Sequence, residues 1–137
     1  MRSIRWEQRL EHFERAVDRL SAACADDAAP LNELEREGLA QRFEYTFELA
    51  WKTLKDYLTW SGVELSPPSP REVIKAATAL EMLEDGALWL EMLERRNWLT
   101  HAYDAATFEA AVLDIRARYV GALAASAAWF VAHRSQP

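Results

Sequence analysis

Apolar residues recur at steps of three and four along most of this chain, which is the spacing of a helix with one buried face. The first stripe predicts a helix from about Ile4 to Cys24, with Ser3 as its N-cap. Its apolar positions are Trp6, Leu10, Phe13, Val17, Leu20 and Cys24. The stretch from Asp26 to Pro30 then interrupts the pattern.

A second stripe predicts the longest helix, from about Leu39 to Ser61. A short helical turn before it is predicted to end at Gly38, a residue typical of helix C-termini. Because the aromatic residues of the stripe follow the helical period, we interpret them as core rather than as a ligand cage. The stripe consists of Phe43, Phe47, Trp51, Leu54 and Leu58.

Capping signals divide the second half of the chain. After a loop rich in proline, Ser69 is predicted to cap a short helix, with Pro70 at its first position and Glu72 completing a capping box. Asp85 is predicted to cap the next helix, and Asp104 the last one, which extends to about residue 133.

These elements predict an all-α, antiparallel up-and-down bundle of four long helices plus one or two short ones. A chain of 137 residues is long enough to bury a core, and we expect a single domain over residues 1–137. The sequence contains no glycine-rich phosphate loop, no alternating strands and no carboxylate pattern of a di-iron bundle. The lack of these three features argues against an ATPase, a dehydrogenase or an oxidase.

Charge and composition narrow the function further. The net charge of −6 disfavours coating of nucleic acid by bulk electrostatics, so any RNA contact would have to be local. A lone cysteine, Cys24, excludes an intramolecular disulfide, and the three histidines are too far apart for a local zinc motif. We therefore expect no metal and no cofactor. The N-terminus does not resemble a signal peptide, and the run from Tyr119 to Ala132 is shorter than the ~20 residues of a membrane span, which predicts a cytoplasmic protein.

The residues best suited to chemistry gather in one stretch, Arg95–Asp104, which reads Arg-Arg-Asn-Trp-Leu-Thr-His-Ala-Tyr-Asp. Arginine is a permanent cation with a fork of donors that suits phosphate. Histidine can take or give a proton near neutral pH, and tyrosine adds a hydroxyl group. The combination indicates a phosphoester site, although spacing alone fits a helix end with capping polar groups equally well.

Each residue of this stretch also has a plainer interpretation. Asn97 is expected to orient its neighbours by hydrogen bonds, and Trp98 to be buried against a helix rather than to stack on a base. His12 and His133 are expected to be ordinary surface residues. Arg96 could serve as the ion-pair partner of a nearby acidic residue: Glu91, Glu94 or Asp104.

Helical geometry limits how the stretch could form a site. On an ideal helix Tyr103 lies about 20° from Arg96, whereas His101 lies about 140° away. A continuous helix would therefore not bring Arg96 and His101 together within one chain. Either the helix ends before His101, or the site is assembled across a two-fold axis.

Two stretches resemble one family closely. They are Phe43-Glu-Tyr-Thr-Phe-Glu-Leu-Ala-Trp-Lys-Thr-Leu-Lys-Asp-Tyr-Leu58 and Trp89-Leu-Glu-Met-Leu-Glu-Arg-Arg-Asn97, which leads to Thr100–Asp104. They are similar to the nucleotidyltransferase substrate-binding proteins, small helical proteins that are commonly encoded beside a minimal nucleotidyltransferase and belong to the HEPN superfamily. The resemblance covers most of the chain and implies a HEPN-like bundle.

The motif of Arg96, four residues, His101, one residue and Tyr103 matches the form found in HepT-like toxins. The resemblance implies a homodimeric, metal-independent ribonuclease in which Arg96 binds phosphate and His101 is the acid/base. It also implies that an MntA-like nucleotidyltransferase partner adenylylates Tyr103. Arg95 also fits the looser HEPN spacing, so the choice of Arg96 as the catalytic arginine rests on the family pattern. Arg95 and Asn97 are predicted to be supporting residues of the site.

Three function classes remain open at this point. The chain could be a ribonuclease toxin acting on RNA, or a non-catalytic substrate-binding subunit of a nucleotidyltransferase. It could also be a plain dimeric scaffold without activity. The complete Arg, His and Tyr set favours the first class, and the acidic net charge mildly favours the second.

Overall fold

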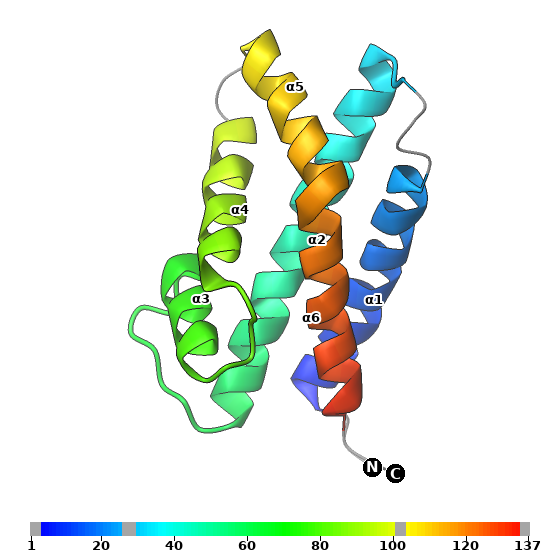
Figure 1. Cartoon of the computed structure of the whole chain (residues 1–137). Helices are drawn as coiled ribbons and strands as arrows, with labels where there is room; N and C mark the ends of the chain where they lie inside the picture. The colour runs from blue at the N-terminus through cyan, green and yellow to red at the C-terminus, as the bar shows by residue number, and fades with distance from the viewer. Residues whose placement is uncertain (1–3, 26–29, 101–103, 135–137) are drawn as a thin grey trace.

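A computed structural model describes residues 4–25, 30–100 and 104–134, and these form helices with short connections (Figure 1). The first two helices are α1 (Arg5–Cys24) and α2 (Glu33–Trp60). They are followed by α3 (Pro70–Ala79) and α4 (Gly86–Leu99). The last run comprises α5 (Ala105–Asp114), the π-helical segment η1 (Ile115–Tyr119) and α6 (Val120–Ala132).

The long elements run alternately up and down (Figure 1). Helices α1 and α2 form one antiparallel pair, α4 returns upward, and the continuous α5–η1–α6 run descends in front of α2. Within the described ranges, α3 is the one short helix that stands apart from the four long elements. The prediction of an all-α bundle with four long helices and one or two short ones is confirmed.

Both predicted stripes form the core. The aromatic residues Trp6 and Phe13 of α1 and Phe43 and Phe47 of α2 are fully buried, and the remaining stripe positions of α2 are also buried. Burial of each such side chain contributes roughly 1.5–3 kcal/mol relative to leaving it exposed. The interpretation of the aromatic stripe as core, rather than as a ligand cage, is confirmed.

The predicted helix break at Gly38 is wrong, because α2 begins at Glu33 and runs straight through this glycine. The true start is a capping box: the side chain of Asn32 accepts a 2.8 Å hydrogen bond from the amide of Glu35, whose carboxylate accepts a 2.9 Å bond from the amide of Asn32. A glycine inside a helix costs about 1 kcal/mol relative to alanine. Packing of the adjacent Leu39, which is buried, offsets that cost.

The first N-cap also differs from the prediction. Residue Ile4, in an extended conformation, is the N-cap of α1 and makes no side-chain capping bond; Ser3 lies outside the described residues. The carbonyl of Ile4 accepts hydrogen bonds from the amides of Glu7 and Gln8, both at 3.1 Å. The helix therefore starts one residue later than capping preference alone suggests.

Two other predicted caps are confirmed. The hydroxyl of Ser69 accepts a 3.3 Å hydrogen bond from the amide of Glu72, with Pro70 as the first residue of α3. The carboxylate of Asp85 accepts a 3.1 Å bond from the amide of Leu88 at the start of α4. The Asp85 cap fixes where α4 begins, and thereby which of its residues reach the far end of the bundle.

The surface agrees with several further expectations. His12 and His133 are exposed, as predicted, and the His133 ring stacks on Trp129 with centroids 3.7 Å apart. Among the described helices, none combines the length and the apolar character that a membrane crossing needs.

Candidate functional site at the end of helix α4

Helix α4 ends at Leu99, before the histidine of the motif. Thr100 forms the C-cap, and its hydroxyl donates a 2.7 Å hydrogen bond to the carbonyl of Asn97. His101 and Tyr103 lie outside the described residues, and the chain resumes at Asp104, directly before α5. Helix α4 thus stops short of His101, as the first of the two arrangements requires, and assembly of the site across a two-fold axis stays a prediction.

The guanidinium group of Arg96 points toward α2. It forms an ion pair with Glu48 and donates a 2.9 Å hydrogen bond to the side-chain oxygen of Asn97. The alternative prediction that Arg96 pairs with Glu91, Glu94 or Asp104 is wrong. Its ion-pair partner, Glu48, lies 48 positions away in sequence, because α4 packs beside α2. Asn97 contacts Arg96 as an orienting residue would, and its role stays a prediction.

Glu48 is a shared acceptor for two cations. Besides Arg96, the Nζ atom of Lys52 lies 3.4 Å from its carboxylate, one helical turn further along α2. Partial burial raises the pKa of Glu48, but the side chains of Trp51, Arg96 and Lys52 together outweigh this and hold the pKa below its ordinary value. The carboxylate is therefore ionised at neutral pH and holds Arg96 in place.

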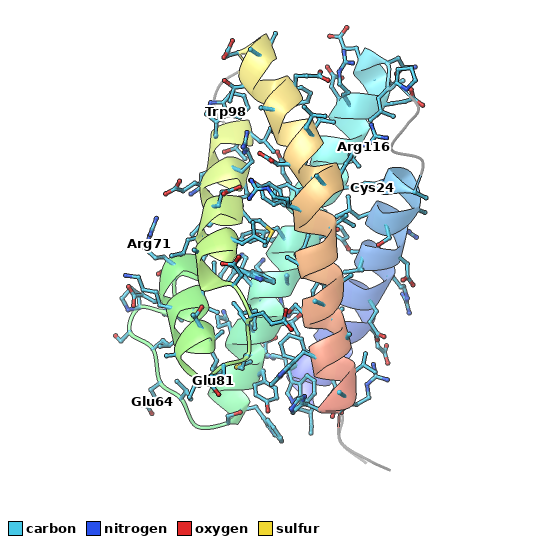
Figure 2. All side chains as sticks on the ribbon, in the orientation of Figure 1. Cys24, Glu64, Arg71, Glu81, Trp98 and Arg116 are labelled. Carbon is cyan, nitrogen blue, oxygen red and sulfur yellow. The ribbon has the colours of Figure 1, made fainter. Side chains whose placement is uncertain are left out.

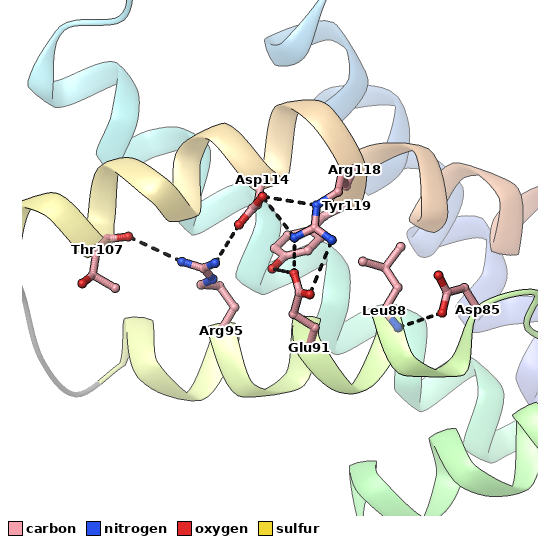
Figure 3. A network of polar contacts seen from close by, with 8 residues as sticks. All are labelled: Asp85, Leu88, Glu91, Arg95, Thr107, Asp114, Arg118 and Tyr119. Carbon is pink, nitrogen blue, oxygen red and sulfur yellow. Dashed lines mark hydrogen bonds and ion pairs between the residues drawn. The ribbon is translucent and has the colours of Figure 1, made fainter.

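Arg95 points in another direction, toward α5 (Figure 3). Its guanidinium donates a 2.7 Å hydrogen bond to Asp114 and a long 3.5 Å bond to the carbonyl of Thr107. The side chain of Arg95 is 18% exposed, compared with 24% for that of Arg96. Arg95 thus ties α4 to the final helical run, whereas Arg96 ties α4 to α2.

A polar network that the sequence did not predict surrounds Arg95 (Figure 3). The fully buried Tyr119 donates a 2.6 Å hydrogen bond from its hydroxyl to Glu91, and Arg118 pairs with Glu91 and with Asp114. Burial and the bond to Glu91 raise the pKa of Tyr119 to about 12. The network joins α4 to α5 and η1. Its bonds from Arg95 to Asp114 and from Tyr119 to Glu91 link residues 19 and 28 positions apart in sequence, beyond the reach of spacing arguments.

Trp98 lies near the upper end of α4 (Figure 2). Its side chain is partly buried and packs against the core cluster. Burial against a helix was the favoured interpretation of this residue, and the partial burial confirms it in part. A base-stacking role has no support from this placement.

An open groove of about 870 Å³ lies beside the end of α4, between the first turns of α2 and helix α5. Leu99 and Ala105, the residues that flank the motif segment 100–104 in the chain, both contribute to its lining. The groove therefore borders the part of the chain that carries the motif.

This fold and this site define a small helical bundle protein whose α4 presents two differently anchored arginines at its end. The chain belongs to the nucleotidyltransferase substrate-binding family, because residues 8–128 match the family described as "Nucleotidyltransferase substrate binding protein like". The match spans all the helices, up to most of α6, and confirms the family that the sequence resembles. The family description connects the chain to a nucleotidyltransferase partner. No curated protein sequence matches this chain.

Proposed function

We propose that this chain is the partner subunit of a minimal nucleotidyltransferase and acts, within that pair, as a HepT-like HEPN ribonuclease toxin. The observation that carries the proposal is the Arg96, His101 and Tyr103 spacing at the point where α4 ends, with the Arg96 guanidinium already fixed by two side chains. The family membership supports the nucleotidyltransferase partner.

Arg96 is suited to bind a phosphate of RNA. A guanidinium has five N–H donors, and the contacts to Glu48 and Asn97 leave others free to meet a phosphate oxygen. A side chain held in advance loses less entropy when the substrate binds. Glu48 is thus the positioning residue, and Arg96 is the residue that contacts the substrate.

His101 supplies the proton transfer in this proposal. The imidazole takes the proton of the ribose 2′-hydroxyl, the freed oxygen attacks the adjacent phosphorus, and the bond to the 5′-oxygen of the next nucleotide breaks. The leaving oxygen takes up a proton, the imidazolium returns its own proton to water, and the products are a 2′,3′-cyclic phosphate and a free 5′-hydroxyl. The step balances without a metal ion.

A homodimer completes the proposed arrangement. An isologous interface that includes the end of α4 would place two copies of the motif close together, so that Arg96 of one copy could serve His101 of the other. Adenylylation of Tyr103 by the partner would then add a bulky, charged group two residues beyond His101 and silence the ribonuclease.

A second candidate function is a non-catalytic subunit that binds the substrate of the nucleotidyltransferase or serves as its scaffold. The specific observation in its favour is that Arg96 already has a carboxylate counterion, with a second carboxylate, Glu44, close enough to interact electrostatically. Both weaken the attraction of this arginine for RNA phosphate.

Cleavage of a labelled RNA by the purified chain in the presence of EDTA tests the proposal. We expect products that end in 2′,3′-cyclic phosphate, and a loss of rate of about 100-fold or more for His101→Ala. The matched control is His12→Ala, an exposed histidine far from α4, which should cleave like the unchanged chain. No cleavage by any variant would favour the non-catalytic subunit, and equal cleavage by the His101→Ala variant would overturn the role of His101.

A further inference from the structure

The groove beside α4 combines an apolar lining with an acidic rim. Its apolar surface comes from Ala40 of α2, Leu99 of α4 and Phe108 of α5, and Leu34 stands at its edge with 77% of its surface exposed. A leucine that exposed has no packing role in the single chain. In Figure 1 the first turns of α2 and of α5 diverge toward the upper end of the bundle. The residues that line the groove lie mostly on these two helices.

The rim carries excess negative charge. Four glutamates line the groove, against one arginine, and that arginine, Arg36, pairs with Glu109 at 3.4 Å. Within the described part of the chain, no ion pair involves Glu33, Glu37 or Glu44. Three carboxylates around an apolar floor attract a cationic ligand and repel phosphate.

Glu44 connects the groove to the proposed site. It lines the groove, is partly buried, and lies within electrostatic reach of Arg96. Burial raises the pKa of this carboxyl, while Arg96 lowers it to a smaller extent. The positive charge of Arg96 therefore offsets only part of the cost of burying the Glu44 carboxylate. A cation bound beside Glu44 would offset more of that cost, and this electrostatic gain would favour binding.

We propose that this groove is the docking surface for a segment of the nucleotidyltransferase partner that carries an apolar side chain flanked by lysine or arginine. The inference rests on the proposed partnership and adds where the partner binds and with what chemistry. RNA is a poor occupant because its phosphates would face three carboxylates. A partner seated here lies beside Leu99 and Ala105, and so next in the chain to the segment that holds Tyr103.

The experiment measures the dissociation constant between the full chain and the minimal nucleotidyltransferase encoded in the same genome, by calorimetry at low and high salt. We expect Glu37→Gln/Glu44→Gln to weaken binding about tenfold or more at low salt, and Leu34→Ser to weaken it at both salt concentrations. The matched controls are Glu11→Gln/Asp18→Asn, two exposed acids of α1, and Leu80→Ser, which removes a leucine that is 54% exposed elsewhere.

The outcomes separate the two proposals. If the unchanged chain does not bind the nucleotidyltransferase at all, the proposed partnership fails, and the docking surface fails with it. If the unchanged chain binds and the groove variants bind equally well, only the docking surface is overturned. Sedimentation of each variant alone covers a third outcome: a change in self-association without a change in partner binding would assign the groove to a second copy, against the proposal.

Discussion

Arg95 and Arg96 are neighbours in sequence, yet they belong to different parts of the structure. Successive residues on a helix point about 100° apart. One guanidinium therefore reaches Asp114 on α5 and the other reaches Glu48 on α2. The sequence could not choose between the two arginines, because both satisfy the HEPN spacing. Asp114 holds Arg95 and Glu48 holds Arg96, so the choice of Arg96 as the functional arginine stays a prediction.

The ion pair of Glu48 gives a prediction about stability and pH. Because the folded-state pKa of Glu48 is depressed, its contribution is present above the unfolded pKa and is lost as the pH falls through the folded value. We expect Glu48→Gln to reduce the free energy of unfolding by about 1 kcal/mol at pH 7 and by much less near pH 3. Urea unfolding at both pH values measures this, with Glu11→Gln as the control. An equal deficit at both pH values would contradict the assignment.

The buried hydroxyl of Tyr119 gives a second prediction at this scale. Removing it in Tyr119→Phe should cost about 1–2 kcal/mol, because the bond to the Glu91 carboxylate is lost while the ring still packs against Phe43. Since the folded pKa is raised to about 12, the hydroxyl contributes fully below about pH 10 and its contribution disappears as the pH rises toward 12.

The free energy of unfolding of the unchanged protein and of Tyr119→Phe is compared from pH 8 up to about pH 12. The unchanged protein should be the more stable at pH 8, and this difference in free energy should disappear as the pH rises. The exposed Tyr45, changed to phenylalanine, is the matched control and should have little effect. A constant difference between the two chains at all pH values would show that the hydroxyl does not titrate as described.

At the scale of the elements, apolar period and capping residues were enough to predict most helices. The stripes on α1 and α2, and the caps at Ser69 and Asp85, appear where local pattern placed them. The errors came where tertiary packing overrides a local signal. Gly38 looked like a helix end, and the π-helical segment from Ile115 to Tyr119 has no signature in the apolar period.

Two glycines give opposite predictions for the helices. Gly38 lies inside α2, where an added Cβ would meet open space, so Gly38→Ala should raise the free energy of unfolding by about 0.5–1 kcal/mol. Gly86 begins α4 where a Cβ would overlap the side chain of Thr78 on α3, so Gly86→Ala should lower it by about 1–3 kcal/mol. Thermal and urea unfolding of both variants checks the signs, and destabilisation by Gly38→Ala would contradict the continuous helix.

At the scale of the whole molecule, the sequence predicted the site only within one element. Arg95, Arg96 and Asn97 lie on the last turns of α4, as expected. The partners that fix them, Glu48 and Asp114, come from other helices, and no local spacing connects those positions. The acidic groove could not be predicted from the sequence for the same reason, since its lining comes from α2, α4 and α5.

The distribution of charge explains how an acidic protein could still act on RNA. The net charge of −6 is spread unevenly, and the groove glutamates lie on one side of the α4 end. RNA would therefore approach the arginine from the side away from the groove, leaving the groove to a cationic partner. The two proposals thus place a local phosphate contact at Arg96 and a separate surface for the nucleotidyltransferase in the groove.

Growth after induction of this chain alone, beside its His101→Ala variant, tests the central claim most directly, with total RNA examined on a gel. The proposed ribonuclease predicts growth arrest and RNA breakdown for the unchanged chain. It also predicts that both disappear in the variant at equal expression. Unimpaired growth and intact RNA with well-expressed, folded protein would contradict the claim and leave the chain as a non-catalytic partner of the nucleotidyltransferase.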